Sequence, residues 1–217
     1  MAQRLADLAR NSNVETNVFL NDERVAQLQS MPLPTDPARR LERDLKLGFE
    51  LLGAGKTSES IALLEDACKR LDVVPAWRDS PIGIEAHSML ATAYMRAGEQ
   101  ENCIRHHGTE SCLLPIQGNG IHKVQDGSRS AIRELTARLS QHPDDLRSRW
   151  LINVAYMTVG EYPDKVPEAW LIPPSAFESD YDIKRFPDVA AKAGLDVRGR
   201  AGAGIMDDFN GDGYLDV

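Results

Sequence analysis

The sequence is poor in several features that mark whole classes of protein. Aromatic residues make up only 6% of its 217 residues, it has three cysteines, and 25 Lys and Arg stand against 33 Asp and Glu, for a net charge of −8. Such an acidic chain repels phosphate backbones, which disfavours nucleic acid as a partner. No apolar run approaches the ~20 residues that a membrane-spanning helix needs. The sequence therefore predicts neither a nucleic-acid-binding protein nor a membrane span.

The motifs of the common enzyme classes are also missing. The chain contains no G-x-S-x-G nucleophile turn and no H-E-x-x-H zinc motif. The GAGKT segment at 53–57 is too short for a phosphate-binding loop and fits a turn between two helices. No carboxylates are paired in a way that marks a general acid and base. We therefore predict no catalytic or organic-cofactor-binding residues.

What the sequence does have, as far as about residue 174, is helical periodicity. Asp36 followed by Pro37 is typical of a helix start, and Gly53 and Gly55 break the apolar pattern that follows. A second apolar pattern comes directly after this break, which predicts an antiparallel helix hairpin. Two short amphipathic helices, at 2–10 and 23–31, are expected to cap the helical region.

Small and large residues in this hairpin follow the spacing of a tetratricopeptide repeat, a helix hairpin of about 34 residues. At offsets 0, 3, 7, 12, 16 and 19 stand Gly48, Leu51, Gly55, Ser60, Leu64 and Ala67. The first three offsets recur in Ala91, Tyr94 and Gly98, and again in Asn153, Tyr156 and Gly160. We interpret Tyr94, Tyr156 and Trp150 as core residues of these repeats. The expected fold is mainly α, an irregular tetratricopeptide-like helical-hairpin solenoid.

Three regions follow from this pattern. Residues 1–36 hold the capping helices, and 37–174 form the helical domain, with a long polar insertion at 99–128. Pro173 and Pro174 cannot continue a helix, so the third region, 175–217, begins there.

The most specific motif lies close to the C-terminus. Oxygen-bearing side chains occupy positions one, three, five and nine of a loop, with glycine at position six, a pattern typical of Ca²⁺ sites. The predicted calcium ligands are Asp208, Asn210, Asp212, the carbonyl of Tyr214, and Asp216. The alternative is an acidic turn in a hairpin without metal.

The residues around this motif resemble a known family. FPDVAAKAGL and GAGIMDDFNGDGYLDV are similar to the opening of an FG-GAP/VCBS (integrin-α-like) β-propeller, and NCIRHHGTESCLLPI and VGEYPDKVPEAWLIPP resemble linkers of the bacterial ASPIC/UnbV and cartilage-acidic-protein group. The resemblance extends from about Leu45 onward. It implies that 175–217 holds a linker and a short β-hairpin from an incomplete propeller blade. Because a propeller needs about four to eight blades, we expect this chain to be the front piece of a longer protein.

The resemblance also implies a compartment. Proteins of that group are generally exported, so a periplasmic or secreted location is expected. The N-terminus, MAQRLADLARNSN, lacks the apolar core and cleavage site of a signal peptide, and taken alone it predicts the cytoplasm.

The insertion carries a second group of residues that could bind a metal. Its members are Cys103, His106, His107, Cys112 and His122. Three interpretations stay open: a disulfide between the two cysteines, ordinary thiols beside surface histidines, or a Zn²⁺ or copper site. Cys68 lies on an apolar helix face and is expected to be buried. His87 and His142 stand alone and are expected to face solvent or cap a helix.

The function predicted from these observations is that of a non-enzymatic interaction scaffold. Stacked helix hairpins offer a concave surface to a protein or peptide partner, and the C-terminal loop would bind calcium structurally. The alternative is a metalloprotein, redox or enzymatic, that uses the cysteines and histidines of the insertion.

Overall fold

The computed structural model describes residues 2–15, 17–78, 80–106, 108, 110–111, 113–181, 187, 189–196, 206–214 and 216. It divides the chain into two compact units, Met1–Glu178 and Ser179–Val217. The described residues are mainly helical, which confirms the predicted fold class at that level. No helix in the described ranges is long and apolar enough to cross a membrane.

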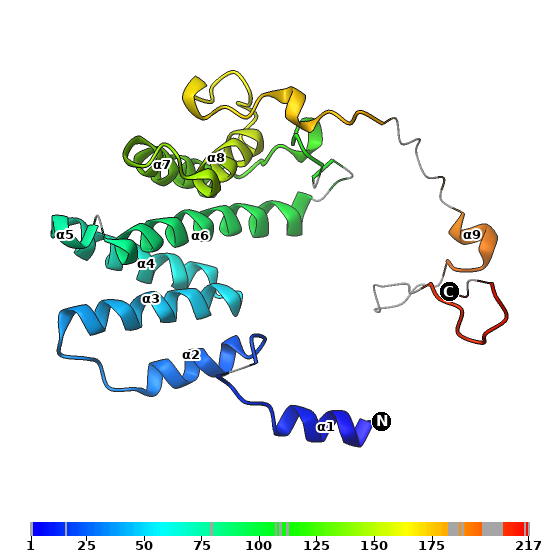
Figure 1. The fold of residues 1–217 in the computed structure, drawn as a ribbon, viewed down its shortest axis with the longest axis horizontal. Coiled ribbons are helices and arrows are strands. Elements are labelled where there is room, and N and C mark those ends of the chain that lie inside the picture. Colours follow the sequence, from blue (N-terminus) through cyan, green and yellow to red (C-terminus); the bar gives the residue numbers. More distant parts are fainter. Residues whose placement is uncertain are drawn as a thin grey trace. The chain divides into compact units, whose positions relative to one another are not determined.

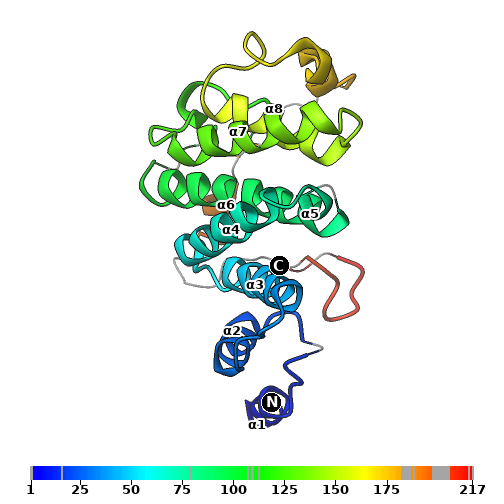
Figure 2. The same cartoon turned by 90° about the vertical axis from the view of Figure 1, so that its left-hand side faces the viewer.

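The first unit is a stack of helices in chain order (Figures 1 and 2). Each long helix from α2 to α8 packs against the next long helix along the chain. The helices are α1 (Ala2–Arg10), α2 (Asn21–Ser30), α3 (Pro37–Gly53), α4 (Thr57–Asp72), the short α5 (Pro75–Arg78), α6 (Pro81–His106), α7 (Asp126–Gln141) and α8 (Leu146–Thr158). The described parts of the connecting segments contain the 3₁₀ turns η1 (Gly118–Gly120), η2 (Glu168–Trp170) and η3 (Pro174–Phe177).

The hairpin of α3 and α4 forms where the sequence predicts it. The Asp36 side chain accepts a hydrogen bond from the Arg39 N–H at 2.9 Å and caps α3. The helix ends at Gly53, and Gly55 turns the chain with a φ of +76° that favours glycine. The buried Ser60 hydroxyl donates to the Gly48 carbonyl at 2.7 Å, so the two backbones approach closely.

Glycine also sets the contact between α6 and α7. A Cβ atom on Gly127 would lie 2.6 Å from the Tyr94 carbonyl oxygen and 2.7 Å from the Gly98 nitrogen. The start of α7 can therefore touch the α6 backbone only because residue 127 has no side chain. α6 continues to His106 and α7 begins at Asp126, so both ends of the predicted insertion at 99–128 are helical.

Buried side chains form separate clusters along the stack. One lies between α3, α4 and α6, and a second lies between α6, α7 and α8. Tyr94 packs against both, as expected of a core residue. Cys68 is buried in the first cluster, which confirms its prediction. A third cluster joins α2 to α3 through Val25, Leu28, Leu47 and Leu51.

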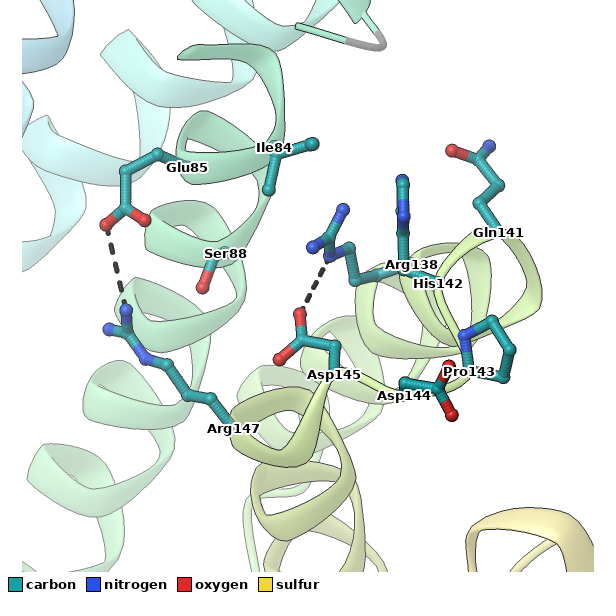
Figure 3. Close-up of a pocket in the computed structure, with 10 residues that line it drawn as sticks. All are labelled: Ile84, Glu85, Ser88, Arg138, Gln141, His142, Pro143, Asp144, Asp145 and Arg147. Carbon is teal, nitrogen blue, oxygen red and sulfur yellow. Dashed lines mark hydrogen bonds and ion pairs between the residues drawn. The ribbon is translucent and has the colours of Figure 1, made fainter. Parts of the chain in front are cut away.

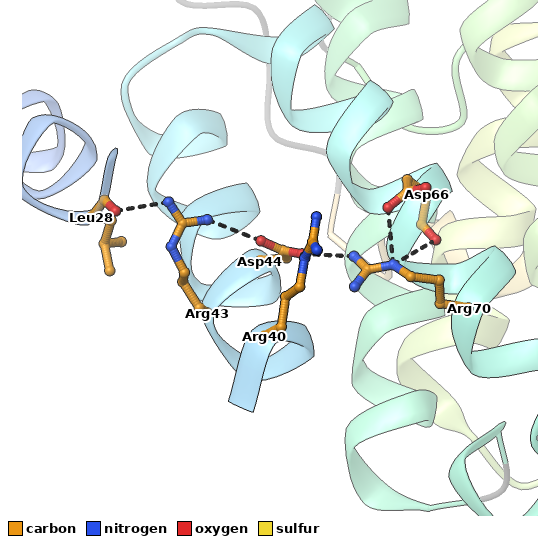
Figure 4. A network of polar contacts seen from close by, with 6 residues as sticks. All are labelled: Leu28, Arg40, Arg43, Asp44, Asp66 and Arg70. Carbon is orange, nitrogen blue, oxygen red and sulfur yellow. Dashed lines mark hydrogen bonds and ion pairs between the residues drawn. The ribbon is translucent and has the colours of Figure 1, made fainter. Parts of the chain in front are cut away.

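A polar network ties α2, α3 and α4 together (Figure 4). The buried carboxylate of Asp44 on α3 accepts hydrogen bonds from Arg43 at 3.0 Å and from Arg70 of α4 at 2.7 Å. Arg43 also donates to the Leu28 carbonyl of α2 at 2.9 Å. Separating these helices would leave the buried Asp44 carboxylate without its partners, which is energetically costly. The network therefore favours this packing of the three helices.

After α8 the chain does not form the second helix of a hairpin in the residues described. It lies along α8 as a strap, residues 168–177, held by the fully buried Asn153. The Asn153 amide nitrogen donates to the Trp170 carbonyl at 2.9 Å, and its amide oxygen accepts from the Ile172 N–H at 3.0 Å. Trp150, predicted to be a core residue, is 41% exposed and contacts Phe177 of the strap at a ring distance of 6.0 Å. The strap covers the α8 face that another helix would bury.

The second unit has little regular structure in its described part. A short helix, α9 (Ala190–Ala193), ends at Gly194, whose φ is +73°. Asp207 and Asp216 form an antiparallel bridge, with N–H···O distances of 3.2 and 2.8 Å. None of the described residues in this unit is buried.

Candidate functional site

The C-terminal loop curls around the Asp208 carboxylate. One Asp208 oxygen accepts hydrogen bonds from the N–H groups of Gly211 at 2.7 Å and Asp212 at 3.1 Å, and the other accepts from Gly213 at 2.9 Å. Both glycines have positive φ, +78° and +86°, which lets the backbone turn its N–H groups inward. The hydrogen bond from Gly213, followed by those from neighbouring N–H groups, lowers the pKa of Asp208. Asp208 is therefore held as a carboxylate.

The other predicted calcium ligands lie in the same loop. The Asn210 amide nitrogen donates to Asp212 at 3.1 Å, Asp212 accepts from the Tyr214 N–H at 2.9 Å, and Asp216 accepts from the Phe209 N–H at 3.1 Å. The bridge between Asp207 and Asp216 closes the loop at its base. Local hydrogen bonds from backbone N–H groups and from the Asn210 amide therefore hold the acidic side chains of the loop.

Three members of the cysteine and histidine group meet at one small cavity in the first unit. Cys103 and His106 belong to the last turn of α6, and His122 follows η1. All three line a cavity of about 10 Å³. His107 and Cys112 lie outside the described residues, and with them the predicted disulfide.

His122 is the most enclosed of the three, with 8% of its surface exposed. Its Nδ1 lies 3.2 Å from the Ser128 hydroxyl, and burial lowers its pKa. Its backbone N–H donates to the Thr158 carbonyl at 2.8 Å, which fixes this residue beside the end of α8.

His87 forms a cluster that the sequence did not predict. Its Nδ1 lies 3.1 Å from a Glu134 oxygen of α7, and its Nε2 lies 3.2 Å from an Asp72 oxygen of α4. Contact with Cys68, then with Glu134, raises the pKa of His87 to about 10, against the opposing effect of burial. The prediction of a lone, solvent-facing histidine is therefore wrong, because its partners come from two other helices. His142, by contrast, caps α7 as expected, donating from its backbone N–H to the Arg138 carbonyl.

Two cavities are lined in part by α6, the first helix of the second predicted repeat. One of about 340 Å³ lies between α3 and α6 and has mainly apolar walls, among them Phe49, Ile82 and Met89. The other, of about 520 Å³, lies between α6 and the turn from α7 to α8 (Figure 3). Two ion pairs lie in its walls. The Arg147 guanidinium is 3.7 Å from a Glu85 oxygen, and the Arg138 guanidinium is 2.9 Å from an Asp145 oxygen. Glu85 lines both cavities.

As they stand, no three His, Cys, Asp or Glu side chains in the described ranges are arranged to hold a metal ion. Comparison with protein-family models, with curated proteins and with solved structures gives no match for this chain.

Proposed function

We propose that the chain is a non-enzymatic interaction scaffold: a tetratricopeptide-like helical solenoid that binds a protein or peptide partner. The observation that carries this proposal is the pair of adjoining cavities that share Glu85 on α6: one faces α3, and the other faces α7 and the turn into α8. The small-residue pattern of the sequence recurs at α3, α6 and α8. A surface built from the first helix of successive hairpins is typical of repeat scaffolds.

The close helix contacts support the same proposal. Gly48 and Ser60 let α3 meet α4, and Gly98 and Gly127 let α6 meet α7. Gly48, Ser60 and Gly98 occupy small-residue positions of the tetratricopeptide-like spacing, at offsets 0, 12 and 7. The strap over α8 then acts as a terminal cap, since an end unit of a stack must cover its outer apolar face.

Phe49 is the natural anchor for a partner in the groove between α3 and α6. Its side chain is 56% exposed although it lines a cavity with mainly apolar walls. Burying an exposed aromatic ring is a common source of binding energy at interfaces. The groove also carries Lys46 and Glu85, which would orient a polar peptide backbone or side chain.

The test is a selection of peptides from a random library on the folded chain, followed by affinity measurement. For the selected peptides, Phe49→Ala should weaken binding by about tenfold or more. Ile104→Ala is the matched control, because Ile104 is 82% exposed and lies outside this groove. Equal affinity for the parent chain and Phe49→Ala, or no selectable peptide, would refute this site.

We propose in addition that the C-terminal loop binds Ca²⁺ through Asp208, Asn210, Asp212, the Tyr214 carbonyl and Asp216, as part of an FG-GAP/VCBS-like hairpin. The curled loop supports this, since the predicted ligands lie within one short loop and the positive φ of Gly213 permits the bend. Binding must turn the carboxylates from backbone N–H groups toward the ion, so affinity should be weak.

Amide NMR spectra recorded during a Ca²⁺ titration test this assignment. Millimolar Ca²⁺ should shift signals of residues 206–217 and leave the helical unit unchanged. Asp212→Ala should abolish the shifts, whereas Asp196→Ala, an exposed aspartate of the same unit, should retain them. Shifts that persist in Asp212→Ala would show that the ion binds elsewhere.

A further inference from the structure

The Cys103, His106 and His122 side chains line one cavity although His122 is separated from the other two by a loop. Asn102, which is buried, holds that loop against α6. Its amide nitrogen donates to the Gly98 and Val124 carbonyls, both at 2.8 Å. Its amide oxygen accepts from the N–H groups of Lys123 at 2.8 Å and Val124 at 3.1 Å. Three of these four hydrogen bonds reach Lys123 and Val124, and they fix the segment that follows His122 beside the end of α6.

A series of hydrogen bonds through two hydroxyl groups determines which nitrogen of His122 carries its proton. The Thr158 hydroxyl lies 2.8 Å from the Ala155 carbonyl and 2.8 Å from the Ser128 hydroxyl. Since a carbonyl only accepts, Thr158 donates its single proton to Ala155, and Ser128 must donate to Thr158. Ser128 then accepts from the Nδ1–H of His122, and Nε2 keeps its lone pair. A histidine whose other nitrogen donates to a fixed partner is the usual arrangement of a metal ligand.

We propose that Cys103, His106 and His122 bind a single zinc ion at this cavity. A thiolate with imidazoles suits Zn²⁺, whereas Ca²⁺ and Mg²⁺ prefer oxygen. A volume of about 10 Å³ holds one water-sized sphere, which admits an ion and excludes an organic ligand. Because the described side chains do not converge as they stand, binding must draw His106, exposed on the last residue of α6, onto the ion. The site is independent of the peptide groove and the calcium loop.

The experiment uses the full chain, free of any histidine tag and kept reduced, titrated with Zn²⁺ against a colorimetric chelator. One ion per chain should bind. Cys103→Ser should weaken binding by more than about 100-fold, while Ser128→Ala should weaken it by about 10–100-fold, the range for the loss of a hydrogen bond behind a ligand. His142→Ala and Cys68→Ala are matched controls that should keep the parent affinity. His106→Ala alters an exposed residue and so reports on binding without risk to folding.

A second measurement identifies the ligand atoms. Co²⁺ in place of Zn²⁺ should give a thiolate-to-metal absorption band that disappears in Cys103→Ser. The absence of stoichiometric Zn²⁺ binding, or binding that survives both Cys103→Ser and His106→Ala, would overturn the proposal. Cys103-dependent binding of Cu⁺ without binding of Zn²⁺ would overturn the assignment to zinc.

Discussion

In the helical unit, Arg70 of α4 binds Asp44 of α3, 26 residues earlier in the chain, and buried clusters join neighbouring helices. In the described part of the C-terminal unit, the hydrogen-bonded residues that lie farthest apart in the sequence are Asp207 and Asp216, and no residue is buried. The first unit is therefore stabilised by burial and long-range contacts. The second takes its shape from the local chemistry of aspartate and glycine. Substitutions in the two units should accordingly have very different effects on unfolding.

The largest effect is expected in the core between α3, α4 and α6. Leu64 is fully buried and fills the space left by the missing side chain of Gly48. Leu64→Ala removes apolar burial and leaves a cavity, so the free energy of unfolding should fall by about 2–5 kcal/mol. Urea denaturation followed by circular dichroism measures this. The matched control is Ile104→Ala, at an exposed position, which should change stability by less than about 0.5 kcal/mol. Equal losses in both variants would contradict a core at Leu64.

An intermediate effect is expected at His87, which joins α4, α6 and α7. Its folded-state pKa of about 10 lies above the ordinary 6.5, so its contribution is complete below pH 6.5 and is lost as the pH rises toward 10. Because one pKa unit corresponds to about 1.4 kcal/mol, the loss over this range should be on the order of a few kcal/mol.

Because other groups also titrate at high pH, the measurement compares the parent chain with His87→Gln. The difference between their unfolding free energies should shrink steadily from pH 6.5 to pH 10. A difference that is independent of pH would show that His87 is uncharged in the folded chain.

The smallest effect on global unfolding is expected from the C-terminal loop. Asp208→Ala removes the acceptor for three backbone N–H groups, yet none of the described residues in this loop is buried. The helical unit should unfold within about 0.5 kcal/mol of the parent. Hydrogen exchange at the amides of Gly211 and Gly213 should nevertheless become faster. Slow exchange retained in the variant would mean that the loop is held by something other than Asp208.

The sequence predicted best the helix ends that are set by residues close together in the chain. Asp36 and Pro37 mark the start of α3, and Gly53 and Gly55 mark its end. The predicted helix at 2–10 matches α1, and that at 23–31 differs from α2 by two residues at its start and one at its end. Cap, turn and apolar spacing all act within a few residues, so they can be recognised without knowledge of the neighbours.

Contacts between distant segments were not predictable in the same way. Glu85 is the carboxylate nearest to His87 in the sequence, yet the partners of His87 are Asp72 and Glu134, which reach it only when three helices pack together. Trp150 has the spacing of a core residue, but it meets the strap at Phe177 in place of a second helix. Nothing in the sequence around Asn153 indicates that its amide would bind the backbone of Trp170 and Ile172.

The sequence by itself determined the helical character, the hairpin of α3 and α4, and the curl of the Asp208 loop, because each depends on residues close together in the chain. Only the tertiary structure brought Cys103 and His106 to the same cavity as His122, paired His87 with two carboxylates, and placed the strap over α8. The physical reason is that side-chain burial and long-range hydrogen bonds depend on which surfaces meet, and many surfaces are compatible with the same local pattern.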